Sequence, residues 1–447
     1  MPARSSTPPP RLSWPKAAVR AAMQRDPLRL FEYGFRRHGE IVLYDTGRLP
    51  YVVIANPADI QHVLLKNYRG YFKSAKHPVL ERVLGKGVIT TNGDVWRQQR
   101  RELAPAFQPR RMARLVEAMA DTSRRVVDGW LSRSDPKIDV YEELSVLTRR
   151  VVGGALFGVS GDELGGELGA ALDTAVERSN LRADRPWNLP LRYPTPRNRR
   201  FHRSLDLIDR WVYDLIAERR AGGGGDDILA MLVAAENEDD NATEDDEALR
   251  DQILNLFFAG FETSATALTW IIGLLAQHWN VASRIRREVQ EVVGDEALTF
   301  EHLGQLKYSG WALDEAMRLF PPIWTNERIA LEDDELGGYH IPKGTMVAVS
   351  TWLLHRNPSA WTDPLTFDPL RFSPERASSR PKNAFAPFGL GPRTCVGNHF
   401  AAMQSKVMLA SIVPRVRIDV PARGMRAQAG ITLSPAGRMP GVLRPRQ

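Results

Sequence analysis

Apolar residues recur with two different periods along this chain of 447 residues, and the helical period covers most of it. Between residues 112 and 220, apolar positions return every three or four residues, which predicts a run of helices. Glycine and proline gather at the expected breaks in this run: 134–136, 158–166 and 185–196. Shorter alternating stretches predict a β-hairpin from residues 41–44 and 51–54. The pattern is that of a mainly helical protein with a few strands.

Two further stretches stand out from this pattern. Residues 73–92 follow neither period and contain glycine, so we expect a long irregular loop there. The longest helix is predicted to run from Thr243, capped through Asp246, to about Gln277, a length of roughly 50 Å. Its middle is apolar enough to suggest a membrane span, but it also holds an acid, an amide and several hydroxyl residues, such as Glu262. We therefore expect a buried central helix.

The start of the chain and its composition favour a soluble protein. Residues 1–25 are rich in proline and arginine and predict a loosely ordered leader, without the apolar run of a signal peptide or transmembrane anchor. Residues 26–447 are expected to form a single domain. A content of 43% hydrophobic and 25% charged residues is ordinary for globular proteins. A single cysteine excludes an internal disulfide and suits a reducing compartment, so a cytoplasmic location is expected.

The net charge of +7 raises the possibility of nucleic-acid binding. No supporting motif accompanies it, so we expect no nucleic-acid partner. Arginines cluster in residues 97–125 and 182–203, where a solvated surface and a surface that steers an acidic protein partner are both open. The proline-rich part of the second cluster is most simply a rigid exposed loop, with contact to a membrane or an acidic substrate as alternatives.

The single cysteine, Cys395, lies in a loop rich in glycine and proline. Gly389 and Gly391 permit positive φ angles, and a helical pattern begins after Gly397. The thiol therefore precedes a helix N-terminus, where a thiolate is favoured, and Arg393 adds a positive charge nearby. An inert cysteine, a nucleophile and a metal ligand all remain open. A hydrolase would need a histidine base, and zinc would need more ligands, whereas haem iron can be held by one thiolate because porphyrin supplies four nitrogens.

The motif Phe388-x-x-Gly391-x-Arg393-x-Cys395-x-Gly397 resembles the cysteine loop of the cytochrome P-450 superfamily, the haem-thiolate monooxygenases. The resemblance extends over about residues 30–445. It implies a mostly α fold with small β-sheets, in which haem b lies between the long central helix and the helix after the cysteine loop. It also implies that Cys395 is the axial ligand of the haem iron, and that Phe388 packs against the loop and excludes water.

Other positions match motifs of the same family. Trp96 and Arg100 share one face of a predicted helix and could hold an anion or form a cation–π pair. The resemblance implies that both bind haem propionates, together with Arg328 and Arg393. Glu315 and Arg318, with an arginine of a later loop, Arg371, resemble the family's structural triad that braces the cysteine loop.

The long helix contains a second motif, Ala259-Gly260-Phe261-Glu262-Thr263. One reading is structural: Thr263 bonds the carbonyl of Ala259, four residues back, and Glu262 lies on a polar edge. The other follows from the resemblance to the family's A/G-G-x-D/E-T motif. It implies a local opening of the helix, where Glu262 and Thr263 deliver protons for the cleavage of dioxygen.

The resemblance implies a monooxygenase that uses dioxygen and a small lipophilic substrate, terpenoid or fatty-acyl. Electrons are expected from a separate ferredoxin and ferredoxin reductase, with the ferredoxin docking near Arg97, Arg100 and Arg101. Two alternatives stay open. One is the same fold acting without external electrons, as in peroxygenases or isomerases, against which the Glu262–Thr263 pair argues. The other is a haem-free cysteine hydrolase or basic binding module.

Overall fold

The computed structural model describes residues 7–47, 49–74, 78–184, 190–222, 227–237 and 245–446. The chain divides into two compact units. Unit 1 consists of Met1–Lys76, Asp314–Cys395 and Ala427–Ser434, and unit 2 consists of His77–Leu313, Val396–Arg426 and Pro435–Gln447. Each unit is built from segments that are far apart in the sequence. The predicted division into a leader and one domain beginning at residue 26 stays a prediction.

Unit 1 is built on a five-stranded sheet with the strand order β1-β2-β8-β5-β3. The strands are β1 (Ile41–Asp45), β2 (Pro50–Ile54), β3 (Tyr71–Lys73), β5 (Asn326–Ala330) and β8 (Met346–Val349). The predicted hairpin is confirmed, with Ile41 opposite Ile54. Strands β2 and β8 run parallel, and the other pairs are antiparallel.

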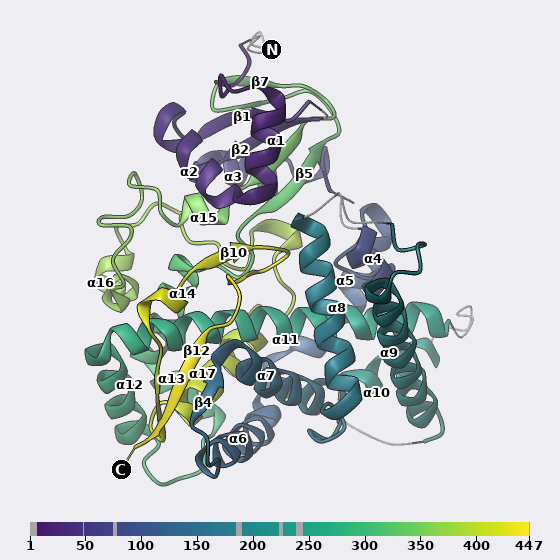
Figure 1. The fold of residues 1–447 in the computed structure, drawn as a ribbon, viewed down its shortest axis with the longest axis vertical. Helices are drawn as coiled ribbons and strands as arrows, with labels where there is room; N and C mark the ends of the chain where they lie inside the picture. Colours follow the sequence, from purple (N-terminus) through teal and green to yellow (C-terminus); the bar gives the residue numbers. More distant parts are fainter. Residues whose placement is uncertain are drawn as a thin grey trace. The chain divides into compact units, whose positions relative to one another are not determined.

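Alternation of side chains along these strands creates two apolar faces. Val42, Tyr44 and Val53 share one core cluster with Phe31 and Trp324. The opposite face packs its own set of buried residues: Ile41, Val52, Ile54, Ile60, Val347 and Leu354. Helices α1 (Lys16–Arg25) and α2 (Pro27–His38) belong to the first cluster, and α3 (Pro57–Gln61), which continues as a π-helix over His62–Lys66, belongs to the second (Figure 1).

Part of the loosely ordered leader predicted for residues 1–25 is helical instead. Residues 1–6 lie outside the described part of the chain, but Lys16–Arg25 form helix α1. Leu12 and Val19 are fully buried in the core of unit 1. The sequence did not predict this helix because only one of its residues, Val19, is buried, which leaves no apolar period to detect.

The remaining elements of unit 1 are short. They include α15 (Thr351–Leu354), α16 (Pro374–Ala377), the hairpin β6 (Asp334–Leu336) and β7 (Tyr339–Ile341), β10 (Ala427–Ala429), and 3₁₀ turns at Tyr68–Gly70, Pro369–Phe372 and Gly391–Arg393. Strand β11 (Leu433–Pro435) pairs with β10, and α14 (Lys307–Leu319) passes from unit 2 into unit 1. These pieces bring loop segments together rather than extending the sheet.

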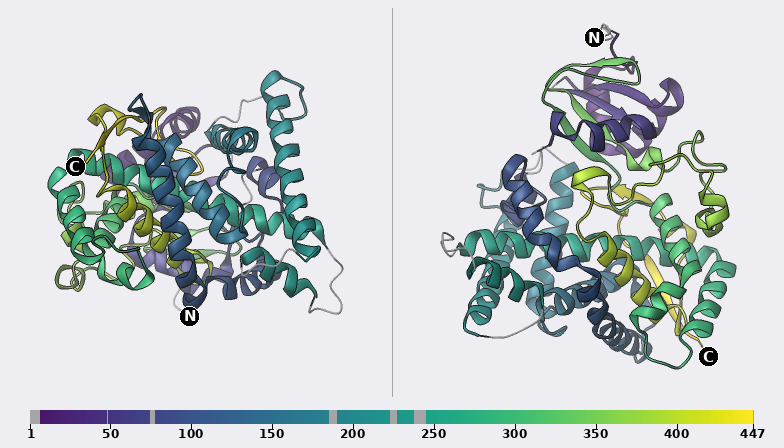
Figure 2. Two further views of the ribbon diagram at one scale, coloured as in Figure 1. Left: turned by 90° about the horizontal axis from the view of Figure 1, so that it is seen from below. Right: turned by 180° about the vertical axis from the view of Figure 1, so that it is seen from behind.

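Unit 2 is helical and is centred on α11 (Asp246–Gln277), which crosses its full width in Figures 1 and 2. Its other helices are α4 (Pro78–Leu84), α5 (Gly93–Leu103), α6 (Pro109–Leu131), α7 (Val140–Phe157), α8 (Gly166–Asp184), α9 (Pro196–Arg220), α10 (Ile228–Asn237), α12 (Trp279–Val292), α13 (Phe300–Gln305) and α17 (Asn398–Ile412). A small sheet has the order β4-β12-β9, from Lys137–Asp139, Pro440–Pro445 and Val416–Asp419. Further 3₁₀ turns span Ala104–Phe107 and Ala422–Gly424.

The helical predictions for unit 2 are largely confirmed, with two corrections. The stretch 73–92 is not irregular throughout, because Pro78–Leu84 form α4. The predicted cap Thr243 lies outside the described residues; the N-cap is Asp245, whose carboxylate accepts a hydrogen bond from the N–H of Ala248. The predicted break at 185–196 falls partly on residues 185–189, which are also outside the described part.

Helix α11 is long and apolar enough, by length and composition, to cross a membrane. Within the protein, however, 83% of its most apolar stretch is buried. Phe257, Phe261 and Trp270 are among its fully buried side chains. The helix therefore forms the core of unit 2, against which α7, α9 and α17 pack.

Candidate functional site

The cysteine loop has the tight geometry that its glycines predicted. The φ angles of Gly389 and Gly391 are +74° and +72°. The N–H of Cys395 donates to the carbonyl of Phe388 at 2.9 Å, which closes the loop on itself. Cys395 is exposed, as a ligand loop requires. At Gly391 no side chain can be accommodated, because a Cβ atom there would lie 2.1 Å from the carbonyl oxygen of Leu64.

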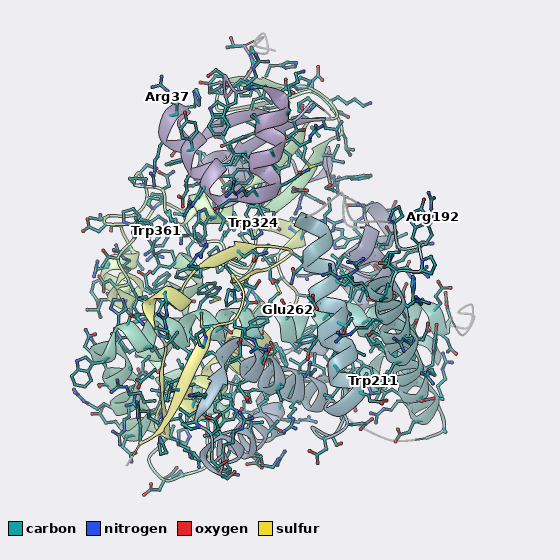
Figure 3. The ribbon with its side chains drawn as sticks, viewed as in Figure 1. Arg37, Arg192, Trp211, Glu262, Trp324 and Trp361 are labelled. Carbon is teal, nitrogen blue, oxygen red and sulfur yellow. The ribbon has the colours of Figure 1, made fainter. Side chains whose placement is uncertain are left out.

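Behind this loop, the predicted triad of Glu315, Arg318 and Arg371 is assembled. Arg318 donates from Nε to Glu315 Oε2 at 2.6 Å and from a terminal nitrogen to Oε1 at 2.8 Å. Arg371 Nε lies 3.2 Å from Glu315 Oε1. The guanidinium of Arg318 also lies 4.9 Å from the ring centre of Trp361, which Figure 3 labels. Because these charged groups are buried together, removal of Glu315 would leave two guanidinium groups in the core without their counter-charge.

The triad reaches the cysteine loop through His355. Arg318 donates to the carbonyl of His355 at 2.8 Å. The ring of His355 in turn accepts the N–H of Ala386 at Nε2, at 3.0 Å, two residues before Phe388. Burial, together with the charges of Arg318 and Arg356, lowers the pKa of His355 to about 3. The ring is therefore neutral near pH 7 and holds the approach to the loop as an acceptor.

Three cationic side chains gather beside the cysteine loop in unit 1. Lys73 and Arg328 are directly opposite each other on β3 and β5, and Arg393 stands two residues before Cys395. Burial lowers the pKa of Arg328 to about 10, and burial with the charge of Arg328 lowers that of Arg393 to about 10. For Lys73, burial and the charges of both arginines lower the pKa to about 7. The cluster thus favours an acidic ligand.

Trp96 and Arg100 lie on α5 in unit 2, four residues apart, as predicted. The indole of Trp96 is buried, with 6% of its surface exposed, and Arg100 is partly exposed. The pair therefore occupies one face of the helix. The propionate roles of Trp96 and Arg100, and those of Arg328 and Arg393, stay predictions.

The motif of the long helix combines parts of both readings. Thr263 is partly buried and donates to the carbonyl of Ala259 at 2.7 Å, as the structural reading predicted. Glu262 does not lie on a polar edge: it is 8% exposed and accepts from the hydroxyl of Tyr141 on α7, at 2.8 Å to each carboxylate oxygen. Figure 3 labels Glu262 within unit 2. The carboxylate of Glu262 and the hydroxyl of Thr263 are thus both present, but each forms a hydrogen bond with another residue, Tyr141 and Ala259 respectively.

The predicted local opening at Gly260 is not seen, because α11 is a continuous α-helix from Asp246 to Gln277. The glycine instead permits close packing: a Cβ at position 260 would lie 3.1 Å from Cγ1 of Val152 on α7. Its carbonyl also accepts a hydrogen bond from Gln404 of α17, at 3.3 Å, and Gln404 bonds Ser264 as well. Two neighbouring helices therefore fix this part of α11.

Sequence reasoning missed Lys73, Tyr141 and Gln404. Lys73 could have been found only from the pairing register of β3 with β5. Tyr141 and Glu262 are 121 residues apart, and no local pattern links them. The pair comes together only because α7 packs on α11.

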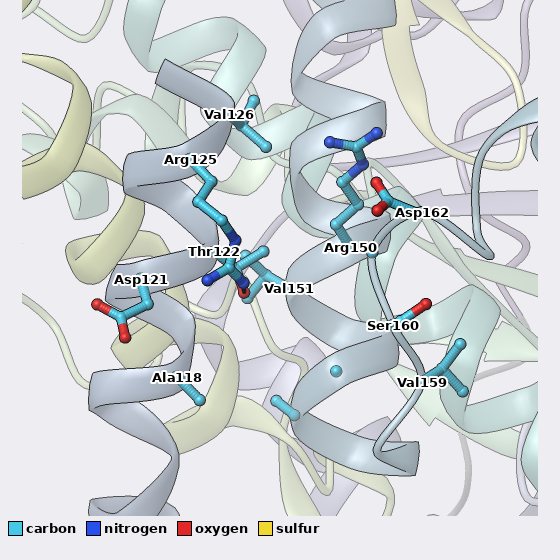
Figure 4. Close-up of a pocket in the computed structure, with 13 residues that line it drawn as sticks. Ala118, Asp121, Thr122, Arg125, Val126, Arg150, Val151, Val159, Ser160 and Asp162 are labelled. Carbon is cyan, nitrogen blue, oxygen red and sulfur yellow. Dashed lines mark hydrogen bonds between the residues drawn. The ribbon is translucent and has the colours of Figure 1, made fainter. Parts of the chain in front are cut away.

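A cavity of about 580 Å³ lies between α6 and α7 in unit 2. Arg125 projects into it from α6 and Arg150 from α7, with Ser160 and Asp162 in the following loop (Figure 4). No predicted site residue lines this cavity.

Comparison with known proteins identifies the family. The cytochrome P-450 family matches residues 7–432 of the chain. The chain belongs to the cytochrome P-450 family. Cyclooctatin synthase of Streptomyces melanosporofaciens is 34% identical over 97% of this chain and 94% of its own length. Cyclooctat-9-en-7-ol 5-monooxygenase of the same organism is 32% identical over 93% and 92%, and pentalenene oxygenase of Streptomyces avermitilis is 32% identical over 89% and 88%.

The solved haem domain of cytochrome P-450DA has the same fold, with a TM-score of 0.88 and 25% identity over 99% of this chain and 98% of that one. The mostly α fold with small sheets is thus confirmed. This P-450 is an oxidoreductase of the monooxygenase class that binds haem b and uses dioxygen, a redox partner and a lipophilic substrate. The residues fit the cofactor: an exposed thiol can ligate iron, and a cationic cluster beside it suits the carboxylates of haem.

Proposed function

We propose that this P-450 hydroxylates a terpenoid, with the thiolate of Cys395 as the axial ligand of the haem iron. The observation that carries the proposal is the cysteine loop. Its exposed thiol, its glycine-dependent path past Leu64 and its neighbouring cations Arg328 and Arg393 form one assembly. When bound, the haem supplies the activation of dioxygen, and its thiolate ligand favours cleavage of the O–O bond.

The other residues have supporting roles in this proposal. Arg328 and Arg393, joined by Lys73 and with Trp96 and Arg100 of α5, would hold the propionates. Phe388 shields the sulfur from water, and Gly391 lets the loop pass Leu64. Glu262 and Thr263 move protons toward the site of dioxygen reduction. The overall reaction consumes dioxygen, two electrons and two protons, replaces one C–H bond by C–OH and releases water.

The terpenoid assignment rests on the relatives rather than on the pocket. One relative at 32% identity is named for the oxygenation of pentalenene, and another for oxidation of cyclooctat-9-en-7-ol. Both names denote carbocyclic compounds. We place the protein in the cytoplasm, where a separate ferredoxin and its reductase deliver the electrons. In this proposal the ferredoxin docks on the exposed arginine face of α5.

The proposal is tested by absorption spectroscopy of the purified protein, reduced with dithionite, before and after addition of carbon monoxide. We expect a strongly red-shifted Soret band, because a thiolate ligand donates electron density to the haem. Cys395→His supplies a nitrogen ligand in place of the thiolate, and its carbonyl band should move to the shorter wavelength typical of histidine-ligated haem. A short-wavelength band in the unaltered protein would overturn thiolate ligation by Cys395.

Incubation with pentalenene and surrogate redox proteins, followed by mass analysis for one added oxygen atom, tests the substrate class.

A further inference from the structure

Tyr141 and Glu262 form a polar contact between two buried helix faces. The phenol oxygen lies 2.8 Å from both Oε1 and Oε2 of Glu262, so one hydroxyl proton is shared by the whole carboxylate. Tyr141 is the second residue of α7, and Glu262 lies in the middle of α11. The contact therefore fixes the direction in which the Glu262 side chain extends from α11.

That direction is not the one in which Thr263 extends. Consecutive residues of an α-helix project about 100° apart, so Glu262 and Thr263 do not face each other. The structure shows the consequence: Thr263 is partly buried and donates to the carbonyl of Ala259, while Glu262 is buried against α7. A proton can pass between them only if the glutamate side chain turns, or if water bridges the gap.

Burial and the nearby carboxylates keep the proton on the phenol. Burial first, and then the negative charge of Glu262, raise the pKa of Tyr141 well above its ordinary value, and Asp173 of α8 acts in the same direction. Asp173 is itself paired with Arg149 of α7 at 2.6 Å. Tyr141 therefore acts as a hydrogen-bond donor, and its removal would leave a largely buried carboxylate without this donor.

We propose that Tyr141 is the positioning residue for Glu262, which it holds against α7 between turnovers and releases toward Thr263 when a proton is delivered. This inference rests on the proton-relay role of Glu262 in the proposed function. Gln404 belongs to the same arrangement, because its bonds to Gly260 and Ser264 keep α11 fixed while the glutamate side chain turns.

The test uses the haem-loaded protein without organic substrate, with NADPH, a plant ferredoxin and ferredoxin reductase. Dioxygen then yields either hydrogen peroxide, with two electrons and two protons, or two water molecules, with four of each. The water-forming rate is obtained from the NADPH consumed and the peroxide formed. We expect Glu262→Gln to lower this rate by about a hundredfold, since a positioned acid–base group contributes at least a factor of about that size. Tyr141→Phe should lower it in the same direction, with haem content and the carbonyl spectrum unchanged.

The double variant separates positioning from a merely structural role. If Tyr141 acts through Glu262, Tyr141→Phe lowers the water-forming rate in the unaltered protein but adds nothing in the Glu262→Gln background. The same non-additivity is expected in the thermal unfolding midpoints of the haem-loaded protein. Tyr71→Phe is a matched control, because it removes a phenol–carboxylate bond of 2.7 Å, to Asp334 in unit 1, and should change stability only.

Three outcomes overturn the inference, and only the third also overturns the proposed function. An unchanged water-forming rate in Tyr141→Phe, beside a lowered one in Glu262→Gln, would remove Tyr141 and leave the relay intact. An equal loss in both backgrounds would show that Tyr141 acts on the fold alone. An unchanged rate in Glu262→Gln would overturn the proton relay of the proposed function, and this inference with it.

Discussion

At the scale of single residues, two glycines of the cysteine loop allow a matched comparison. Gly389 and Gly391 have nearly the same positive φ, but nothing lies within 4 Å of a Cβ built at Gly389. At Gly391 the same atom would collide with the Leu64 carbonyl. Gly389→Ala should therefore cost only the left-handed conformation, about 1–2 kcal/mol.

Gly391→Ala bears this conformational cost and also displaces the loop from the helical turn that contains Leu64. We expect it to lose most of its haem during purification, whereas Gly389→Ala retains it. The ratio of Soret to protein absorbance, with thermal unfolding of each variant, measures the difference. Equal haem loss in both variants would mean that the shared backbone conformation, and not the Leu64 contact, sets the requirement.

The same scale shows how far sequence reasoning reached. Cys395, its glycines and the Glu315–Arg318 pair were predicted because each belongs to a local motif whose residues are close in the sequence. Arg371 lies in a later loop and was predicted only from the resemblance to the family. Glu262 was located, but its burial was not, because the residue that covers it, Tyr141, lies on another helix. Lys73 was missed for the same reason: a strand register decides its neighbours.

At the scale of secondary-structure elements, helices with a clear apolar period were predicted well, and short ones were not. Helix α4 has only seven residues and α1 buries a single side chain, so neither has a periodic signal. The absence of an opening in α11 has a related cause. Whether a helix opens at Gly260 depends on α7 and α17, through Val152 and Gln404, and not on the motif itself.

His355 links elements of unit 1, and this link makes stability depend on pH. Its folded-state pKa of about 3 lies below the unfolded value of about 6.5. The unfolded chain therefore binds more protons between these values. The stability that the neutral ring contributes is complete above pH 6.5 and is lost as the pH falls toward 3, by about 1 kcal/mol per pH unit.

His355→Gln keeps an acceptor for the Ala386 N–H but cannot be protonated. We expect the unfolding free energy of this variant to depend less steeply on pH between 4 and 6 than that of the unaltered protein. Denaturant titrations at several pH values measure the two slopes. Carboxylates such as Asp334, whose pKa the structure lowers, contribute equally to both proteins. Identical slopes would therefore contradict the conclusion that the neutral ring of His355 stabilises the folded protein.

At the scale of the whole molecule, the net charge of +7 is distributed unevenly. In unit 2, exposed arginines follow one another along α5 and α6: Arg97, Arg101, Arg110, Arg114 and Arg124. Such a surface attracts an acidic protein over a Debye length of about 8 Å at physiological salt. The proposed ferredoxin is a partner of this kind, and its electrons are needed only when dioxygen is the oxidant.

Charge reversal at Arg97 or Arg101 should therefore lower ferredoxin-driven turnover, by about tenfold at low salt, with a smaller effect as salt rises. Turnover driven by hydrogen peroxide should be unchanged, because it needs no docking. Arg29→Glu is the matched control: like Arg97, Arg29 is exposed on a helix and paired with an aspartate three residues earlier. Initial rates at several salt concentrations measure both routes.

If the peroxide route falls as much as the ferredoxin route, the arginines support the fold or the haem rather than the partner. If Arg29→Glu has the same effect as Arg97→Glu, the response reflects total charge and not a docking face on α5.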